Sequence, residues 1–253
     1  EMVERMHSPR RSVRIGLVGK YVRLHDAYLS VAEALRHAAW AQDASAEIAW
    51  IDAEELEKPE GERLLSDLDG IIVPGGFGLR GTEGMLAAAR YARERHLPYF
   101  GICLGMQTAV IEFARDAAGL AGANSGEFDP ASPHKVIDFM PGQSESVDKG
   151  GTLRLGACPC EIVPGTTLAR CYGQDEVWER HRHRYELNNA YRGRLTAAGL
   201  TLSGLSPDGK LVEAVELGSE RFFVGVQYHP EFKSRPNRPH PLFTGFISAA
   251  LEK

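Results

Sequence analysis

The sequence lacks several features that mark whole classes of protein. Four cysteines in 253 residues are too few for a disulfide framework, and Cys158 and Cys160 have no second pair with which to hold zinc. No stretch approaches the roughly 18 apolar residues of a membrane-spanning helix. The first eleven residues are charged, without the apolar core of a secretory signal. These absences favour a cytoplasmic protein with no bound metal and no membrane contact.

Basic residues are also scarce relative to acidic ones. The net charge is −5, and the densest basic run, residues 180–184, is short, so nothing indicates nucleic-acid binding. Glycine, by contrast, is abundant at 27 residues. These glycines have no Gly-X-Y period, which excludes collagen, so they must mark tight turns or close backbone approaches.

Strands and helices are predicted to alternate along the first half of the chain. Apolar runs predict strands at 13–19, 47–51, 71–73 and 98–102, and helical periodicity predicts helices at about 26–42, 82–95 and 104–118. Asp26 is expected to cap the first helix and Leu29 to lie on its buried face. The alternation is typical of an α/β fold with a mostly parallel central sheet flanked by helices.

The second half is predicted to be richer in strands. Five are expected, at 136–139, 158–163, 200–203, 211–216 and 222–228, before a final helix at 241–251. With few helices between them, these strands are expected to form an antiparallel extension of the sheet. Residues 1–12 are interpreted as a linker remnant and residues 13–253 as one domain.

A strand, a cysteine and a helix follow one another at Gly-Ile-Cys-Leu-Gly, residues 101–105. This is the nucleophile-elbow pattern with Cys103 in place of serine. The N-terminus of the following helix favours a thiolate, which is the reactive form of cysteine. A buried, inert cysteine after a strand would leave the same pentapeptide, so the motif alone leaves both interpretations open.

A candidate base follows the strand predicted at 222–228. His229 and Glu231 are two residues apart, so in an extended chain they point the same way, and Pro230 is expected to keep the segment out of a helix. A carboxylate beside an imidazole fixes its tautomer and stabilises its cation. A surface turn is the alternative interpretation, but together with Cys103 the pair predicts a Cys-His-Glu triad.

Acyl transfer at a thiolate also requires donors for the oxyanion. The N–H of Leu104 follows the nucleophile, and the glycine-rich run at 74–78 follows another predicted strand and offers a second donor. The same run could form an ordinary turn or a phosphate loop. A phosphate loop is disfavoured because no Gly-Lys-Ser/Thr follows.

Together these motifs resemble the class I glutamine amidotransferases, which have a flavodoxin-like fold, and more closely the glutaminase domains of CTP synthases. The resemblance covers most of the chain, with matching stretches GLVGKYV at 16–22, PGGFGLRG at 74–81, GICLGMQ at 101–107, ERHRHRYELNN at 179–189 and HPEF at 229–232. It implies that Cys103, His229 and Glu231 hydrolyse L-glutamine to glutamate and ammonia through a thioester.

The resemblance also implies how the substrate is held. Gly76 and Leu104 would donate their N–H groups to the oxyanion, and Phe77 would shape the entrance. The residues that grip glutamine would be Gln107, Glu127 and Arg184. A carboxylate suits the α-ammonium of glutamine and a guanidinium its α-carboxylate. Without the resemblance, residues 180–184 would be interpreted as a solvated charged strand.

The implied partner is a synthetase domain, absent from this chain, where the ammonia would aminate UTP to CTP. No cofactor is expected in this domain, and ATP, Mg and GTP are expected only with the full-length enzyme. Residues 138–150 look short for the family, which leaves the response to GTP open. The alternatives are a standalone class I glutaminase or γ-glutamyl hydrolase with another acceptor, and a non-catalytic interaction module.

Overall fold

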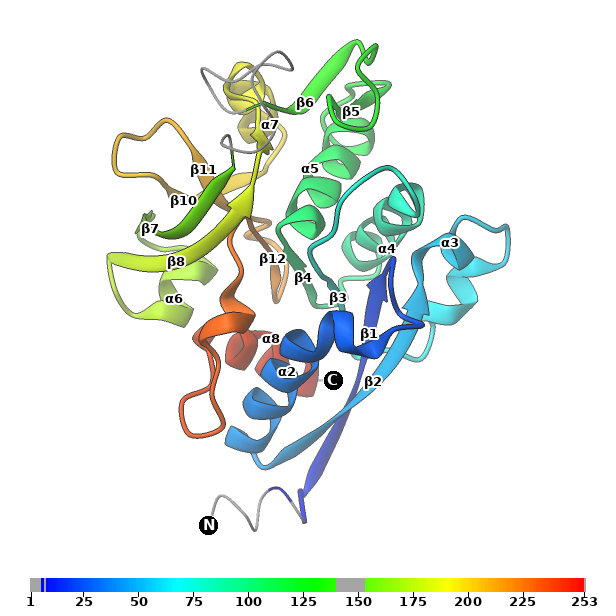
Figure 1. The fold of residues 1–253 in the computed structure, drawn as a ribbon, viewed down its shortest axis with the longest axis vertical. Coiled ribbons are helices and arrows are strands. Elements are labelled where there is room, and N and C mark those ends of the chain that lie inside the picture. Colours follow the sequence, from blue (N-terminus) through cyan, green and yellow to red (C-terminus); the bar gives the residue numbers. More distant parts are fainter. Residues whose placement is uncertain (1–5, 7, 140–152, 253) are drawn as a thin grey trace.

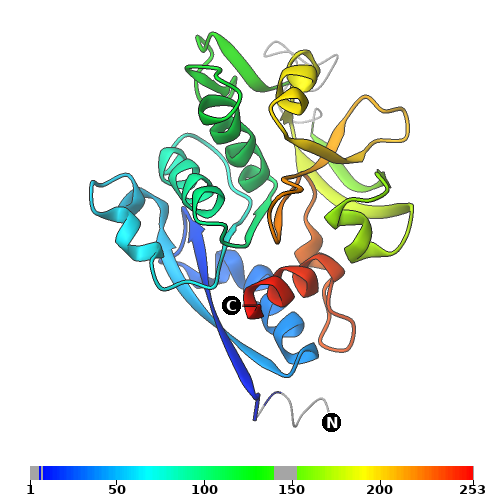
Figure 2. The same ribbon diagram turned by 180° about the vertical axis from the view of Figure 1, so that it is seen from behind.

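A nine-stranded sheet runs through the molecule, with helices packed on its two faces (Figures 1 and 2). The structure is a computed structural model that describes residue 6 and residues 8–139 and 153–252. The order of the strands in the sheet is β2-β1-β3-β4-β12-β11-β10-β7-β8. Its first five strands are all parallel and follow the 2-1-3-4-5 order of flavodoxin-like folds.

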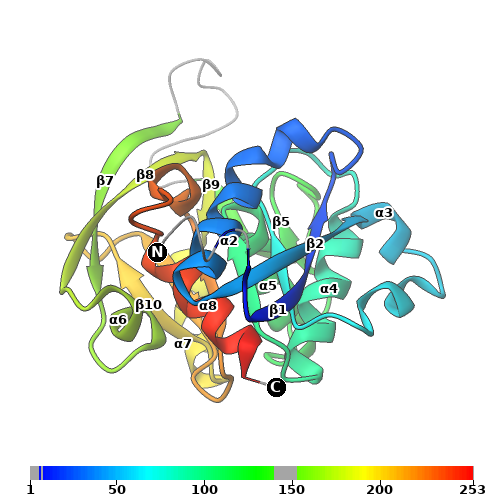
Figure 3. The same ribbon diagram turned by 90° about the horizontal axis from the view of Figure 1, so that it is seen from below.

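The sheet changes from parallel to antiparallel at β12. The parallel strands are β2 (Ala44–Asp52), β1 (Arg11–Gly19), β3 (Gly70–Val73), β4 (Tyr99–Ile102) and β12 (Phe223–Val226). The antiparallel strands are β11 (Val212–Glu216), β10 (Thr201–Leu205), β7 (Arg154–Ile162) and β8 (Glu176–His183). Figure 3 shows the two halves on opposite sides of α8 (Pro241–Leu251).

Two apolar cores lie on the two faces of the sheet. One contains side chains of α2 (Leu29–Ala41), α6 (Thr167–Tyr172) and α8. The other contains side chains of α3 (Ala53–Leu56), α4 (Thr82–Glu94), α5 (Leu104–Asp116) and α7 (Arg192–Ala197). The short turns between these elements are the 3-10 helices η1 (His25–Tyr28), η2 (Gly61–Leu65), η3 (Asn189–Tyr191) and η4 (Pro230–Lys233). None of the helices in the described residues is long and apolar enough to cross a membrane.

The predicted α/β fold with a mostly parallel sheet and an antiparallel extension is confirmed, but two strands were misplaced. The strand expected at 136–139 lies in a separate three-stranded sheet, formed by β5 (Ala123–Ser125), β6 (His134–Phe139) and β9 (Tyr185–Leu187). The strand expected at 222–228 is parallel to β4 and ends at Val226. The positions of these strands depend on distant pairing partners, which a local apolar run does not reveal.

The start of the first helix also differs from expectation. Asp26 lies in η1 and provides no cap, because the α-helix begins only at Leu29 and has no side-chain cap bond. Leu29 is 54% exposed, since it opens the first turn instead of lying one turn inside the helix. At the chain start, residues 1–5 and 7 of the predicted linker lie outside the described residues, and Arg11 already belongs to β1. Of the segment 138–150, residues 140–150 also lie outside them.

A close helix crossing provides a test of this packing. A Cβ on Gly84 of α4 would lie 1.8 Å from the carbonyl oxygen of Ala53 in α3. Gly84→Ala therefore forces the two helices apart, and we expect it to lower the free energy of unfolding by about 1–3 kcal/mol. Gly193→Ala in α7 is the matched control, because no atom lies within 4 Å of its Cβ position. Thermal or urea unfolding measures both, and equal stability of the two variants would contradict the packing described.

Candidate active site

The backbone at Cys103 adopts a conformation that side chains other than glycine rarely adopt. Its φ is +53° and its ψ −101°, and it occupies the N-cap position of α5 directly after β4. The flanking glycines make this turn sterically possible. A Cβ on Gly101 would lie 2.6 Å from the carbonyl oxygen of Gly105, and one on Gly105 would lie 2.0 Å from that of Val73. The elbow geometry predicted from the pentapeptide is therefore present.

Three neighbouring parallel strands deliver the candidate residues to one edge of the sheet. Val226 of β12 pairs with Ile102 of β4, so the residues that follow these two strands emerge side by side. β3 pairs with the other side of β4 and leads into the glycine-rich run at 74–78. Ligands bind at the carboxyl ends of strands in folds of this kind, because several loops converge there.

His229 and Glu231 are in direct contact, but not for the predicted reason. Nδ1 of His229 lies 2.8 Å from Oε1 of Glu231, and both side chains are largely buried. The segment is not extended, because Pro230 is the first residue of η4, a position that suits its fixed φ. The 3-10 turn brings the carboxylate back to the imidazole. The ring of Phe232 stacks on that of His229, with centroids 5.6 Å apart.

The surroundings of His229 favour its protonated form. Burial alone would lower its pKa, but hydrogen bonds to Cys103 and Glu231, together with their charges, raise it to about 10. Since Glu231 occupies Nδ1, the Nε2 atom is the nitrogen left for the thiol. The arrangement can thus hold a proton between the sulfur and the imidazole, as nucleophilic catalysis by cysteine requires.

The glycine-rich run lies against the triad. A Cβ on Gly75 would lie 2.8 Å from Cε1 of His229 and 3.5 Å from Cβ of Cys103. A Cβ on Gly76 would lie 3.2 Å from Cδ2 of Leu104, so the two predicted oxyanion donors are neighbours. Only a glycine at position 75 leaves room for the imidazole next to this loop.

Lys20 supports this loop, a role the sequence analysis did not assign. Its ammonium donates to the carbonyl oxygens of Phe77, at 3.3 Å, and Gly78. Burial, with the charge of Arg80, lowers the pKa of Lys20 to about 8, although Glu127 opposes the shift. The lysine follows β1 in the stretch at 16–22 that was noted for family likeness, and its position after a strand was the available signal.

The residues predicted to grip glutamine belong to three different parts of the chain. Oε1 of Glu127 accepts the N–H of Gly78 at 3.1 Å, so this carboxylate is next to the glycine loop. Gln107 is buried in α5 and donates to the carbonyl oxygen of Tyr185 at 2.9 Å. Arg184 lies half-buried between β8 and β9. Phe77 is exposed, and the guanidinium of Arg182 lies 6.0 Å from its ring centroid.

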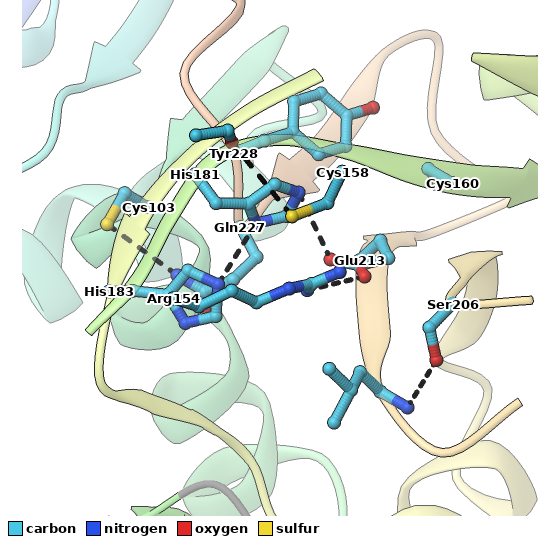
Figure 4. Close-up of polar contacts among 12 residues, drawn as sticks. Cys103, Arg154, Cys158, Cys160, His181, His183, Ser206, Glu213, Gln227 and Tyr228 are labelled. Atoms are coloured by element: carbon cyan, nitrogen blue, oxygen red, sulfur yellow. Dashed lines mark hydrogen bonds and ion pairs between the residues drawn. The ribbon is translucent and has the colours of Figure 1, made fainter. Parts of the chain in front are cut away.

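Behind the thiol lies a layer of buried polar side chains that the sequence analysis did not predict. Gln227 lies directly against the elbow, because its Nε2 is 3.6 Å from Sγ of Cys103 and its Oε1 is 3.1 Å from Nε2 of Gln107. Figure 4 shows Gln227 hydrogen-bonded to the cysteine, and in the same view the two buried histidines of β8, His181 and His183, hydrogen-bonded to each other. Side-chain burial alternates along β8, so the interpretation of residues 180–184 as a solvated strand is wrong for these histidines.

The two histidines are held neutral. Burial, reinforced by the charge of Arg154, lowers the pKa of His181 to about 2 and that of His183 to about 3. Nδ1 of His183 faces the carbonyl oxygen of Tyr185 at 3.2 Å, so the proton of that ring is on Nδ1, and its Nε2 accepts from His181 at 3.0 Å. Within the described residues, no group of three or more His, Cys, Asp or Glu side chains could hold a metal ion.

Arg154 and Glu213 complete this layer farther from the thiol. They form a buried ion pair, in which Nη1 of Arg154 lies 2.6 Å from Oε1 of Glu213. Nε2 of His181 lies 3.6 Å from the other oxygen, Oε2, of the same carboxylate. Burial raises the pKa of Glu213, and Arg154 opposes that shift. The charges of this layer are thus compensated internally.

Comparison with known proteins identifies the family. The class-I glutamine amidotransferase family matches residues 23–249. The chain is 60% identical over 252 residues to a CTP synthase of Carboxydothermus hydrogenoformans, covering 100% of this chain and 47% of that protein. It is 61% identical over 249 residues to a CTP synthase of Thermomicrobium roseum, covering 98% and 45%. The chain therefore spans about half the length of the curated relatives it matches.

Solved structures agree with the sequence comparison. The glutaminase domain of Trypanosoma brucei CTPS with bound acivicin is 44% identical, with a TM-score of 0.89 over 95% of this chain and 94% of that one. A glutamine amidotransferase of Thermotoga maritima has a TM-score of 0.51 at 14% identity, over 95% of this chain and 96% of that one, which shows the shared fold. The chain belongs to the class I glutamine amidotransferases and, within them, to the glutaminase domains of CTP synthases.

Proposed function

We propose that the chain hydrolyses L-glutamine to glutamate and ammonia at Cys103. The observation that carries the proposal is the meeting of a cysteine on a left-handed turn with a histidine that is hydrogen-bonded to a glutamate at 2.8 Å. The pKa of His229, raised to about 10, favours a thiolate–imidazolium pair near neutral pH.

The proposed reaction has two halves. The sulfur of Cys103 attacks the side-chain amide carbon of glutamine, and the N–H groups of Gly76 and Leu104 bind the oxyanion. His229 donates its proton to the leaving nitrogen as the C–N bond breaks, which releases ammonia and leaves a γ-glutamyl thioester. The neutral imidazole then takes a proton from water, and the resulting hydroxide attacks the thioester carbon. The C–S bond breaks, Cys103 leaves as a thiolate beside the imidazolium, and glutamate is released. Glu231 orients the imidazole and stabilises its cation.

Substrate binding is assigned to groups around the elbow. Glu127 suits the α-ammonium of glutamine and Arg184 its α-carboxylate, while Gln107 and Phe77 border the same space. The contact of Glu127 with the Gly78 N–H supports its place beside the oxyanion loop. No cofactor enters the proposed hydrolysis.

The proposed acceptor of the ammonia is a synthetase domain that aminates UTP to CTP, with ATP, Mg and GTP acting only in the complete enzyme. The chain covers about half of its relatives, which leaves room for such a domain. Exposed apolar side chains on the loops after β1, β3 and β12 would suit its docking, namely Tyr21, Leu24, Phe77, Leu79 and Phe232. A cytoplasmic setting fits the four cysteines, all described and all free.

Replacement of the nucleophile tests the first half of the proposal. Cys103→Ala should lower ammonia release more than about 10³-fold, because the variant lacks the sulfur that forms the thioester in the proposed reaction. Cys171→Ala is the control, since burial raises the pKa of that thiol to about 11 and leaves it unreactive. Mass spectrometry after treatment with acivicin should find the adduct on Cys103. Wild-type turnover by Cys103→Ala, or an adduct only on another cysteine, would refute the mechanism.

The role of Glu231 is tested through pH dependence. Glu231→Gln removes a charge that raises the pKa of His229, so the imidazolium should lose its proton at lower pH. The alkaline limb of kcat/KM, which reports the free enzyme, should therefore move below its wild-type position. We expect kcat to fall by about 10²–10⁴-fold.

The control for this variant is Glu220→Gln. It alters another histidine–glutamate pair, in which Nδ1 of His96 lies 2.9 Å from Oε2 of Glu220. That change should leave the pH profile of glutaminase activity where it is. An unmoved alkaline limb in Glu231→Gln would show that Glu231 does not stabilise the His229 cation.

The proposal that a synthetase domain accepts the ammonia is tested by adding such a domain to this chain. The chain is mixed with a separately produced synthetase half of a CTP synthase, glutamine, UTP, ATP, Mg and GTP, and CTP is measured. With glutamine we expect CTP with the wild-type chain and none with Cys103→Ala. Ammonium chloride in place of glutamine should support CTP synthesis with either chain. Glutamate release without CTP, in a mixture that responds to ammonium chloride, would favour a glutaminase with another acceptor.

A further inference from the structure

The buried face of β8 carries a carboxylate that the proposed mechanism does not use. Burial alternates along the strand, and Glu179 is fully buried while both of its chain neighbours are exposed. A carboxylate without exposure to water is costly unless hydrogen bonds and opposite charges compensate it. The residues that contact Glu179 therefore show which parts of the chain this carboxylate joins.

One oxygen of Glu179 has three partners from three parts of the chain. Oε1 lies 3.1 Å from Nζ of Lys233, 3.0 Å from Nε2 of His240 and 3.1 Å from the hydroxyl of Tyr172. Nδ1 of His240 accepts the N–H of Leu242, so its Nε2 carries the proton and donates to the carboxylate. Burial acts to raise the pKa of Glu179, but His240 and Lys233 outweigh it and lower that pKa, which keeps the group charged.

The first of these contacts reaches the turn that carries Glu231. Lys233 is the last residue of η4, and Glu231 lies in the middle of that turn. The Lys233 ammonium also donates to the carbonyl oxygen of Trp178 at 2.5 Å, so it is clamped between the backbone and a side chain of β8. The C-terminal end of the turn is thereby fixed to the strand.

Further contacts fix the other end of the same segment. The hydroxyl of Tyr172, which contacts Glu179, also lies 3.2 Å from the hydroxyl of Tyr228, the residue before His229. The backbone N–H of His229 donates to the carbonyl oxygen of Arg180 at 2.8 Å, one residue beyond Glu179. Residues 178–180 thus hold the segment 228–233 at both ends, with the charge of Glu179 at the centre.

We propose that Glu179 is a positioning residue, which sets the place of the His229 imidazole against the Cys103 thiol by tying residues 228–233 to β8. Glu179 touches neither the thiol nor the imidazole and acts through Lys233 and the two tyrosines. The inference rests on the proposed glutaminase function, because the geometry of this pair matters only if the pair reacts. A displacement of about 1 Å at a reacting group can cost about 10²-fold in rate.

Two variants loosen this connection from opposite sides. Glu179→Gln removes the charge, and Lys233→Met removes its partner on the turn. Each should lower kcat for glutamine hydrolysis about 10- to 100-fold. KM should stay near the wild-type value, because the glutamine-binding groups are untouched. Lys233→Arg keeps a positive charge next to Glu179, so its kcat should be much closer to the wild-type value than that of Lys233→Met. If only the packing of the lysine side chain mattered, the charge of the replacement would make no such difference.

Glu176→Gln is the matched control, because Glu176 lies on the same strand but is exposed. It should leave kcat and KM unchanged. The rate at which iodoacetamide alkylates Cys103, followed by peptide mass spectrometry, gives a readout independent of turnover. It should fall in Glu179→Gln and Lys233→Met and remain unchanged in Glu176→Gln.

Thermal unfolding separates positioning from loss of the fold. If Glu179→Gln does not fold, Lys233→Met decides, since the Lys233 side chain is 42% exposed. The inference is overturned if folded Lys233→Met keeps wild-type kcat and alkylation rate, or if its kcat falls only in proportion to the folded fraction. A wild-type chain that releases no ammonia would instead refute the proposed function, and the alkylation comparison would still decide the role of Glu179.

Discussion

Where β4 passes into α5, three stretches of backbone meet at distances that leave no space for side chains. The positions of Gly101 and Gly105 are closed to a Cβ by the carbonyl oxygens of Gly105 and Val73. This crossing forces Cys103 into a left-handed conformation and places its sulfur at the N-terminus of α5. The same crossing brings β3 close enough for the glycine run to reach the thiol. The placement of Cys103, of the predicted oxyanion donors and of the glycine loop depends on this one steric constraint.

The second requirement of the site is a fixed histidine, and both halves of the sheet contribute to it. β12 delivers His229 beside the cysteine through its parallel pairing with β4. Polar contacts with β8 hold the turn that follows, through Lys233 to Trp178 and Glu179 and through the N–H of His229 to Arg180. The antiparallel half of the sheet also buries charged side chains next to side chains of opposite charge, such as Arg154 of β7 and Glu213 of β11. The two halves of the sheet therefore have different tasks, one to form the turn at the nucleophile and the other to hold the base.

The features that could be predicted from the sequence are those that local chemistry determines. The elbow at Cys103 was predictable because adjacent glycines and a strand-to-helix change are visible within five residues. The pairing of Cys103 with His229 crosses 126 positions of the sequence, and it was inferred from complementary chemistry and family likeness. The extended geometry expected around Pro230 was wrong because a proline can also begin a 3-10 turn. Lys20, Gln227 and the inward-facing histidines of β8 were missed, since a polar residue reveals its burial only when its partners are known.

The position of β12 has a consequence for how the chain folds during its synthesis. Among the described residues it is the last strand in sequence order, yet it lies between β4 and β11 in the middle of the sheet. In the part of the chain that the structure describes, eleven strands precede β12, so the two halves of the sheet can join only after these have been synthesised, and until then β4 and β11 each have an unpaired edge. Exposed edges of this kind recruit other strands and lead to aggregation. The strand that closes them also brings His229 to the thiol, so in a nascent chain Cys103 meets His229 only when the sheet is complete.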